Sequence, residues 1–164
     1  MAEFRPGADS ARAFRDALGR YATGVTVVTC ATPDGPLGIT ANSFASVSLD
    51  PPLVLWSPAK ASRRFGPFAE AAQFAIHVLG AEQQGVCAHF ARQGHDFTGL
   101  DWSAGDDGVP LISGCLARFE CSTFSRHDGG DHLIIVGRVA RATMREGEAL
   151  LFAHGNYGRF TRTE

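Results

Sequence analysis

Small polar residues gather in one segment of the first third of the chain. The segment 38–48 reads GITANSFASVS, and Thr40, Asn42 and Ser43 are its main hydrogen-bonding side chains. Small residues let a flat ring approach the backbone closely, while hydroxyl, amide and backbone N–H groups can bond its polar edges. The alternative is an ordinary polar strand face followed by a turn, which the same composition also favours.

A second candidate group lies just downstream, where Lys60, Ser62 and Arg63 precede a short predicted helix. A cation, a hydroxyl and a helix start converge there, which is a combination that binds anions such as phosphate. The alternative is that Ser62 only caps the helix and the neighbouring arginine is solvated. Lys60 is the only lysine in the chain.

Composition and missing motifs exclude several classes of protein. The net charge of −2 and the lack of a basic run exclude a nucleic-acid-binding surface. No stretch approaches the about 20 apolar residues of a membrane helix, and the first residues lack the apolar core of a secretory signal. Four cysteines without C-x-x-C spacing predict free, buried thiols in a reducing compartment, so we expect a cytoplasmic protein.

Familiar catalytic signatures are also missing from the sequence. It contains no G-x-G-x-x-G or G-x-x-x-x-G-K-[ST] loop for nucleotide phosphates, and no G-x-S-x-G elbow of a serine hydrolase. None of the six histidines forms H-E-x-x-H, and no metal site is expected from their spacing.

Hydrophobic patterning predicts strands joined by hairpin-length turns. The predicted strands are 25–29, 37–41, 43–49, 53–56, 74–79, 115–126 and 131–145. The predicted helical segments are 10–21, 62–71, 82–92 and a short piece near 147–153, and 93–110 reads as a loop rich in Gly and Asp. Because strands outnumber helices, we expect an antiparallel barrel with peripheral helices, in a single domain over 1–164 with its core at 12–160.

The ordered set of motifs resembles the short-chain flavin reductase family. The runs 23–29 (TGVTVVT), 38–44 (GITANSF) and 46–55 (SVSLDPPLVL) carry most of the likeness. It continues through Lys60-Ala61-Ser62, Phe90-Ala91, Gly99, Trp102, Gly130-Asp131-His132 and Tyr157. The resemblance implies a mainly β fold, the FMN-binding split β-barrel, as a homodimer with flavin near the subunit interface.

The resemblance also implies a set of flavin contacts. Thr40, Ala41, Asn42 and Ser43 would line the isoalloxazine ring and the ribityl chain. The remaining implied contacts are Ser46, Val47 and Ser57 beside them, Lys60, Ser62 and Arg63 at the phosphate, Phe90 and Ala91 as a cover, and Tyr157. Tyr157 would close the pocket from the C-terminal tail, or alternatively belong to the dimer interface.

The activity implied by the resemblance is hydride transfer from NAD(P)H to FMN or FAD, which supplies reduced flavin to a partner monooxygenase. His132, with Asp131 beside it, would act at the nicotinamide end of the site; the alternative is a barrel histidine without a kinetic role. NADH is favoured over NADPH because no phosphate cluster is evident, although Arg126 and Arg138 leave that choice open. One rival function is a non-catalytic flavin-binding or electron-transfer protein of the same fold, and another is a scaffold with an empty pocket.

Overall fold

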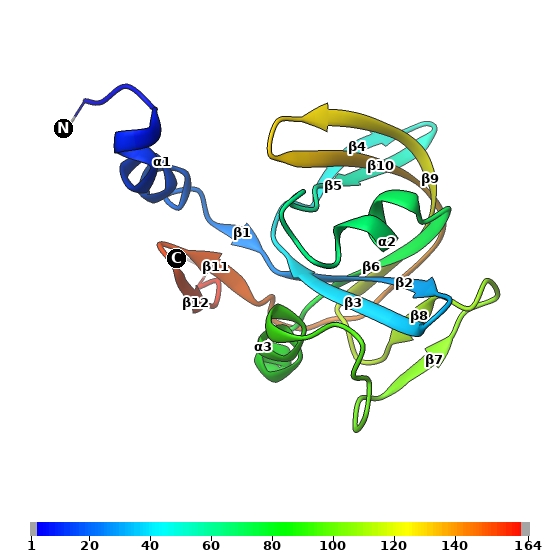
Figure 1. The fold of residues 1–164 in the computed structure, drawn as a ribbon. Helices are drawn as coiled ribbons and strands as arrows, with labels where there is room; N and C mark the ends of the chain where they lie inside the picture. Colours follow the sequence, from blue (N-terminus) through cyan, green and yellow to red (C-terminus); the bar gives the residue numbers. More distant parts are fainter. Residues whose placement is uncertain (1–2, 162–164) are drawn as a thin grey trace.

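The structure is a computed structural model that describes residues 3–161. Its main sheet is antiparallel, with strands in the order β3 (Gly35–Ala41), β2 (Thr26–Thr32), β6 (Gln73–Val78), β9 (Ala117–Gly129), β10 (His132–Met144), β5 (Pro52–Trp56) and β4 (Ala45–Leu49). The sheet curves around a buried core, but the edge strands β3 and β4 do not pair with each other within the described residues (Figure 1). The predicted mainly β split barrel is therefore confirmed.

The remaining elements lie around this barrel. Two short helices are α2 (Phe65–Glu70) and α3 (Gln84–Arg92), the latter preceded by a 3-10 turn at Ala81–Gln83, and a small hairpin joins β7 (Trp102–Ala104) to β8 (Pro110–Ile112). A separate group, which we call the arm, comprises a 3-10 turn (Ala8–Ser10), α1 (Ala11–Leu18), β1 (Thr23–Gly24), β11 (Leu151–Ala153) and β12 (Asn156–Gly158). The arm extends to one side of the barrel (Figure 1).

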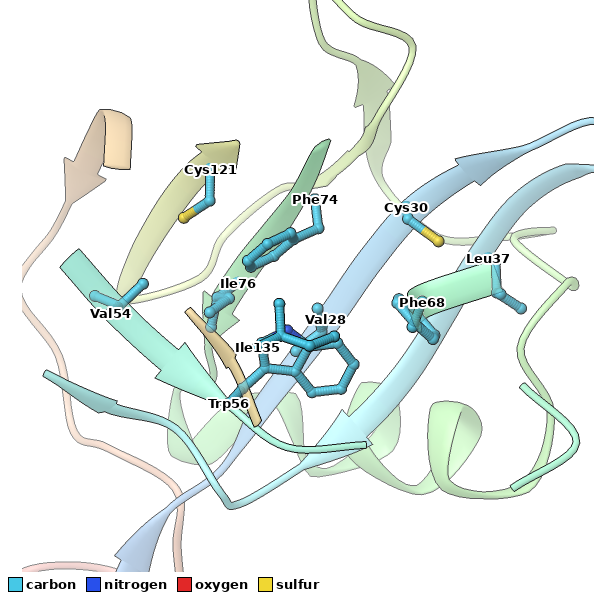
Figure 2. Packing of buried hydrophobic residues seen from close by; sticks show 10 residues of the cluster. All are labelled: Val28, Cys30, Leu37, Val54, Trp56, Phe68, Phe74, Ile76, Cys121 and Ile135. Carbon is cyan, nitrogen blue, oxygen red and sulfur yellow. The ribbon is translucent and has the colours of Figure 1, made fainter. Parts of the chain in front are cut away.

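Strand β2 is buried on both faces because it separates two apolar clusters. Val28 and Cys30 belong to the cluster inside the barrel, whereas Val27 belongs to a second cluster that α3 covers with Cys87 and other residues. This explains why residues 25–30 form an unbroken buried run rather than an alternating one. Figure 2 shows the barrel cluster around Trp56, which is only 1% exposed.

The long hairpin β9–β10 turns over one mouth of the barrel. Gly130 has a φ of 78°, a left-handed conformation that favours glycine in the tight turn between the strands. Two backbone hydrogen bonds tie the start of β10 to the segment after β5: Lys60 N–H donates to the Asp131 carbonyl at 2.9 Å, and Leu133 N–H donates to the Pro58 carbonyl at 3.1 Å. The turn and residues 58–60 therefore form one fixed rim.

Three predicted segments differ from the structure. The piece near 147–153, predicted as helical, forms strand β11, because Thr23 pairs with Phe152 and Leu150 bonds the backbone of Leu79. The predicted loop 93–110 contains β7 and the start of β8, whose Ile112 pairs with Trp102. The predicted helix 10–21 ends at Leu18. In the first case backbone pairing with β1, which is distant in the sequence, overrides the local pattern, and in the second β7 pairs with the adjacent β8 as a hairpin.

The four cysteines are free, as predicted; Cys30, Cys87 and Cys121 are also buried as predicted, whereas Cys115 is only partly buried. Within residues 3–161, no helix has the length and apolar character needed to cross a membrane.

Candidate functional site

A hollow of about 190 Å³ opens where β3, β5 and the start of β10 meet. It is lined by Ile39, Thr40, Ala41, Asn42, Ser43, Trp56, Ser57, Ala59, Ser62 and His132. All but Ile39, Trp56 and Ala59 are site residues predicted from the sequence. The fold therefore brings together the end of β3 with the residues that follow it, the segment after β5 and the first residue of β10.

The side-chain oxygens of the polar segment bond the protein itself. Thr40 Oγ1 donates to the carbonyl of Cys87 in α3 at 2.7 Å. Ser43 Oγ accepts the Ser57 N–H at 2.9 Å and donates to the Ser57 carbonyl at 3.3 Å, which ties this segment to the end of β5. These bonds fix the wall of the hollow in the absence of a ligand. The groups of this segment that remain free to bind a ligand are mainly backbone groups and the side-chain amide oxygen of Asn42.

Asn42 stands at the edge of the hollow nearest the arm. Its Nδ2 donates to Thr23 Oγ1 at 3.3 Å, and its side chain is exposed. Thr26, one strand away, donates from Oγ1 to the Ala41 carbonyl at 2.7 Å. The amide oxygen of Asn42 has no hydrogen-bond donor among residues 3–161, so it can accept a bond from a ligand N–H.

His132, the first residue of β10, also lines the hollow. Its Nδ1 lies 2.7 Å from Asp131 Oδ1, and the His132 side chain is 43% exposed. The hydrogen bond to His132, followed by the charge of that ring, lowers the pKa of the Asp131 carboxyl below its usual range. With Nδ1 bound to a carboxylate, Nε2 is the ring atom left for a ligand, since it has no partner among the described residues.

Of the two cations at the predicted anion-binding end, Lys60 is already paired within the described residues and Arg63 is not. Lys60 Nζ forms an ion pair with Asp128 Oδ1, and this bond lowers the pKa of the Asp128 carboxyl. The Ser62 hydroxyl lines the hollow and accepts the N–H of Arg64 at 3.2 Å. Arg63 is exposed and makes no hydrogen bond or ion pair within residues 3–161.

Arg64 is a structurally important residue that the sequence does not reveal. Its half-buried guanidinium donates to the carbonyls of Gly38 at 3.0 Å, Phe90 at 2.6 Å and Ala91 at 3.3 Å. Burial, followed by the charge of Arg63, lowers the pKa of Arg64. This side chain holds β3 against the end of α3, but Arg63 and Arg64 are adjacent arginines, and no local signal distinguishes them.

Several predicted contacts lie outside the hollow. Ser46 and Val47 are exposed on β4. The Phe90 ring is fully buried against Phe97 and directly faces Gly38, so it contributes to the second apolar cluster rather than to an open surface. Ala91 is exposed at the end of α3. Their backbone carbonyls bind Arg64, and neither residue lines the hollow.

Tyr157 lines a small neighbouring cavity of about 130 Å³ together with Thr40, Ala41, Asn42 and others. The Cys87 thiol donates to Tyr157 Oη at 3.2 Å. This bond, followed by burial, raises the pKa of Tyr157 to about 12. Since Asn42 borders both cavities, Tyr157 lies beside the hollow, on the side of the arm.

Two arginines considered for a cofactor phosphate are engaged elsewhere. Arg126 donates to the carbonyls of Ala69 and Ala71 at 2.6 and 2.9 Å. The Arg138 guanidinium lies 5.1 Å above the ring of Phe124. Neither residue lines the hollow.

Comparisons with known proteins give one consistent family. The model of the flavin reductase like domain matches residues 18–161. The chain is 60% identical over 159 residues to an FMN reductase (NADH), SmoA, of Agrobacterium fabrum, covering 97% of this chain and 91% of that one. It is 43% identical over 148 residues to the reductase subunit HsaB of a flavin-dependent monooxygenase of Rhodococcus jostii, covering 89% and 76%.

Solved structures agree with these sequence matches. An NADH:FAD oxidoreductase of Streptomyces globisporus superposes with a TM-score of 0.91 at 38% identity over the full length of both chains. The same oxidoreductase in complex with NAD and FAD fragments gives a TM-score of 0.87 at 39% identity, covering 98% of each chain.

Proposed function

The chain belongs to the flavin reductase like family, and from this premise we propose that it transfers a hydride from NADH to a flavin and supplies the reduced flavin to a separate monooxygenase. The observation that carries the proposal is the hollow. There the small residues 40–43, at the end of β3 and just beyond it, meet both Ser62 and His132. Hydride transfer needs a nicotinamide carbon held against the flavin ring and requires no protein acid or base at the reacting atoms.

The wall formed by Thr40–Ser43 fits a flat ring. Ala41 and Ser43 are small; the Ala41 carbonyl is held by the Thr26 hydroxyl, and the Ser43 hydroxyl is held by the Ser57 N–H. Because this wall is already ordered, little conformational entropy is lost when a ligand binds. The wall also offers backbone N–H and carbonyl groups to a ring that has donors and acceptors along one edge. We place the isoalloxazine ring here, with Ser57 beside it and Ser46, Val47 and Tyr157 at its margins.

In this proposal His132 orients the nicotinamide. Its Nδ1 is held by Asp131, so Nε2 faces a ligand in a fixed orientation. In this position it can bond the carboxamide of the nicotinamide or stabilise negative charge on the reduced ring. We assign His132 as the residue that contacts the reactants and Asp131 as the residue that positions it.

Lys60, Ser62 and Arg63 form the phosphate end in this proposal. Ser62 lines the hollow, and Lys60 lies two residues before it on the fixed rim. The carboxylate of Asp128 competes with a phosphate for Lys60, which suits a flavin that must leave after reduction. We rank FMN above FAD because SmoA, at 60% identity, is an FMN reductase, and NADH above NADPH because Arg126 and Arg138 are engaged elsewhere.

A second copy of the chain is the partner that best fits the outer face of β4, β5 and β10. Val54 and Trp56 face the core, so Leu53 and Leu55 of the same strand face outward. Leu49 of β4 is 97% exposed, and Phe124 of β9, the strand next to β10, is 50% exposed. An exposed apolar face next to a binding site is typical of an interface, and we propose a homodimer.

Single-domain organisation and a cytoplasmic location complete the proposal. One family model spans 18–161, and the described elements surround one curved sheet. Free thiols at four cysteines suit a reducing compartment, where NADH is also available.

The function is tested by steady-state oxidation of NADH and NADPH with the purified protein. Reactions contain no flavin, FMN, FAD or riboflavin. The proposal expects NADH oxidation that rises and saturates with added flavin, with FMN the preferred acceptor. Flavin binding without turnover would leave a non-catalytic flavin-binding protein, and the absence of both would leave a scaffold.

A further inference from the structure

The small cavity of about 130 Å³ borders both the hollow and the arm. Its lining includes Thr40, Ala41 and Asn42, which also line the hollow, and Phe152 and Tyr157, which belong to the arm. Tyr157 pairs with Phe152 across β11 and β12, and the centroids of their rings lie 5.3 Å apart. The position of Tyr157 therefore sets the border of the hollow on the side of the arm.

Cys87 of α3 makes a hydrogen bond to each of these two groups of residues. Its backbone carbonyl accepts Thr40 Oγ1 at 2.7 Å, and its thiol donates to Tyr157 Oη at 3.2 Å. Cys87 is 0% exposed, whereas Tyr157 is 41% exposed. One buried residue thus connects the wall of the hollow to the last strand of the arm, which lies next to α3 (Figure 1).

Strand β12, which carries Tyr157, has few other contacts that hold it in place. It is an edge strand that pairs with β11 alone among the strands of residues 3–161. The side chain of Asn156 bonds within its own turn, to the His154 carbonyl. The thiol of Cys87 therefore makes the one side-chain hydrogen bond between β12 and another part of the fold within the described residues.

The hydrogen bond from Cys87 leaves the hydroxyl hydrogen of Tyr157 available. A phenol has one hydrogen to donate, and here its oxygen accepts the thiol hydrogen. The Tyr157 hydroxyl donates to no atom of residues 3–161. A flavin ring carries carbonyl oxygens and ring nitrogens, which are the acceptors that this hydroxyl requires.

We propose that Cys87 is a positioning residue for flavin binding. Its thiol holds the Tyr157 hydroxyl at the edge of the hollow, and that hydroxyl donates a hydrogen bond to the flavin ring. This inference rests on the proposed function, because that function supplies the ring in the hollow. Since the bonded atom belongs to the ring and not to the phosphate, the contribution is equal for riboflavin, FMN and FAD.

The first test is the affinity of the full chain for FMN and for riboflavin, measured by the quenching of flavin fluorescence. Cys87→Ala and Tyr157→Phe should each weaken the binding of both flavins by about threefold to tenfold, because one hydrogen bond to the ring is lost or misplaced. Unchanged affinity in Cys87→Ala or in Tyr157→Phe overturns the proposal.

Cys30→Ala is the matched control for the loss of a buried thiol. Cys30 is also 0% exposed, but it belongs to the barrel cluster and does not line the hollow. Its variant should bind both flavins within about twofold of the wild type, although it loses packing in the same way. A loss of flavin affinity equal to that of Cys87→Ala would show that the effect comes from weakened packing.

The second test asks whether Cys87 acts through Tyr157. In the background of Tyr157→Phe, Cys87→Ala should have no further effect on flavin affinity. Cys87→Ser keeps a hydrogen-bond donor at this position and should bind flavin within about twofold of the wild type, also where Cys87→Ala fails to fold. In steady-state assays Cys87→Ala should raise the KM for flavin and change kcat by less than about twofold. Additive losses, a fall in kcat at unchanged KM, or weak flavin binding by Cys87→Ser would reduce Cys87 to a packing residue of α3.

Failure of this inference is distinguishable from failure of the proposed function. Flavin binding needs no NADH, so a protein whose flavin affinity depends on Cys87 and Tyr157 but which oxidises no NADH keeps the inference and loses the reductase. A protein that reduces flavin, with the same KM for flavin in Cys87→Ala and Tyr157→Phe as in the wild type, keeps the reductase and loses the inference.

Discussion

Two histidines, one in the barrel wall and one on its rim, each have Nδ1 hydrogen-bonded to an oxygen atom. They differ in burial and in whether Nε2 also has a hydrogen-bond partner. His77 Nδ1 lies 3.0 Å from the Val27 carbonyl, and His132 Nδ1 lies 2.7 Å from Asp131 Oδ1. The second nitrogen of His77 accepts the Ile112 N–H at 3.1 Å, whereas Nε2 of His132 has no partner among residues 3–161. His77 is fully buried, and His132 is 43% exposed at its side chain.

The difference shows how this fold separates stability from ligand binding. In the wall, both ring nitrogens of His77 join β6 to β2 and β8, so the ring is a neutral structural link with no capacity left for a ligand. On the rim, a carboxylate orients His132 while one nitrogen stays available. The same hairpin turn supplies Asp128 and Asp131, one paired with Lys60 and the other with His132.

The largest expected effect is a loss of folding stability at acidic pH, caused by His77. Burial, with a smaller contribution from Arg118, lowers the pKa of His77 to about 4, although its bond to Val27 opposes this. As the pH falls, His77 is therefore protonated in the unfolded chain at a higher pH than in the folded protein. The stability that His77 contributes above pH 6.5 is lost progressively as the pH falls to about 4. The expected loss is about 3 kcal/mol, measured by urea unfolding across this pH range.

A matched control separates His77 from the other histidines. His95→Gln changes an exposed histidine and should keep the pH dependence of the wild type. Stability that stays level between neutral pH and pH 4.5, or a slope that disappears in His95→Gln, would show that His77 does not bind its proton as the buried geometry requires.

His132→Ala gives the next largest effect and acts on turnover. Because the side chain faces the hollow and packs no core, the variant should unfold at the wild-type temperature and bind oxidised flavin within about twofold. Its kcat/KM for NADH should fall about tenfold through poorer orientation of the nicotinamide. Loss of stability or of flavin affinity, rather than of turnover, would make His132 a second structural histidine.

Asp131→Asn tests whether the rim carboxylate acts through His132. The amide can still bond Nδ1 but no longer fixes its N–H tautomer by charge, so kcat/KM should fall about threefold to fivefold with flavin affinity unchanged. In the background of His132→Ala the same change should have no further effect. Additive losses in the double variant would assign Asp131 a role of its own.

Asp128→Asn should have the smallest effect, and this effect should be a gain in flavin affinity rather than a loss of function. Removing this exposed carboxylate frees Lys60, so FMN should bind about twofold to fivefold more tightly, a gain that high salt removes. Riboflavin, which lacks the phosphate, is the control ligand and should bind as before. Equal changes for FMN and riboflavin would contradict a phosphate at this end.

Local sequence signals were sufficient where the chemistry depends on neighbouring residues. The run from Gly38 to Ser48 indicated a polar wall because its small residues and hydroxyls are contiguous, whereas the role of His132 was implied by the family resemblance that Gly130-Asp131-His132 helps to carry. The strands were predictable because residues 25–30 and 74–79 are rich in β-branched and apolar residues, nearly all of which the fold buries.

Long-range contacts explain what the sequence could not provide. Strand β11 reads as a helix in isolation and becomes extended because β1 and Leu79 bond its backbone. Arg64, rather than Arg63, turns inward because the carbonyls of Gly38 and Phe90 meet there. The pairing of Lys60 with Asp128 joins residues 68 positions apart, so the charge state of the phosphate end depends on the closed hairpin.

The most direct test of the central claim is anaerobic rapid mixing of NADH with the protein saturated with FMN. We expect the flavin absorbance to bleach in a single turnover at least as fast as steady-state oxidation, and to bleach about tenfold more slowly in His132→Ala. Bound flavin that stays oxidised in the presence of NADH, or reduction that is equally fast in the absence of protein, would contradict the assignment of the hollow as the site of hydride transfer.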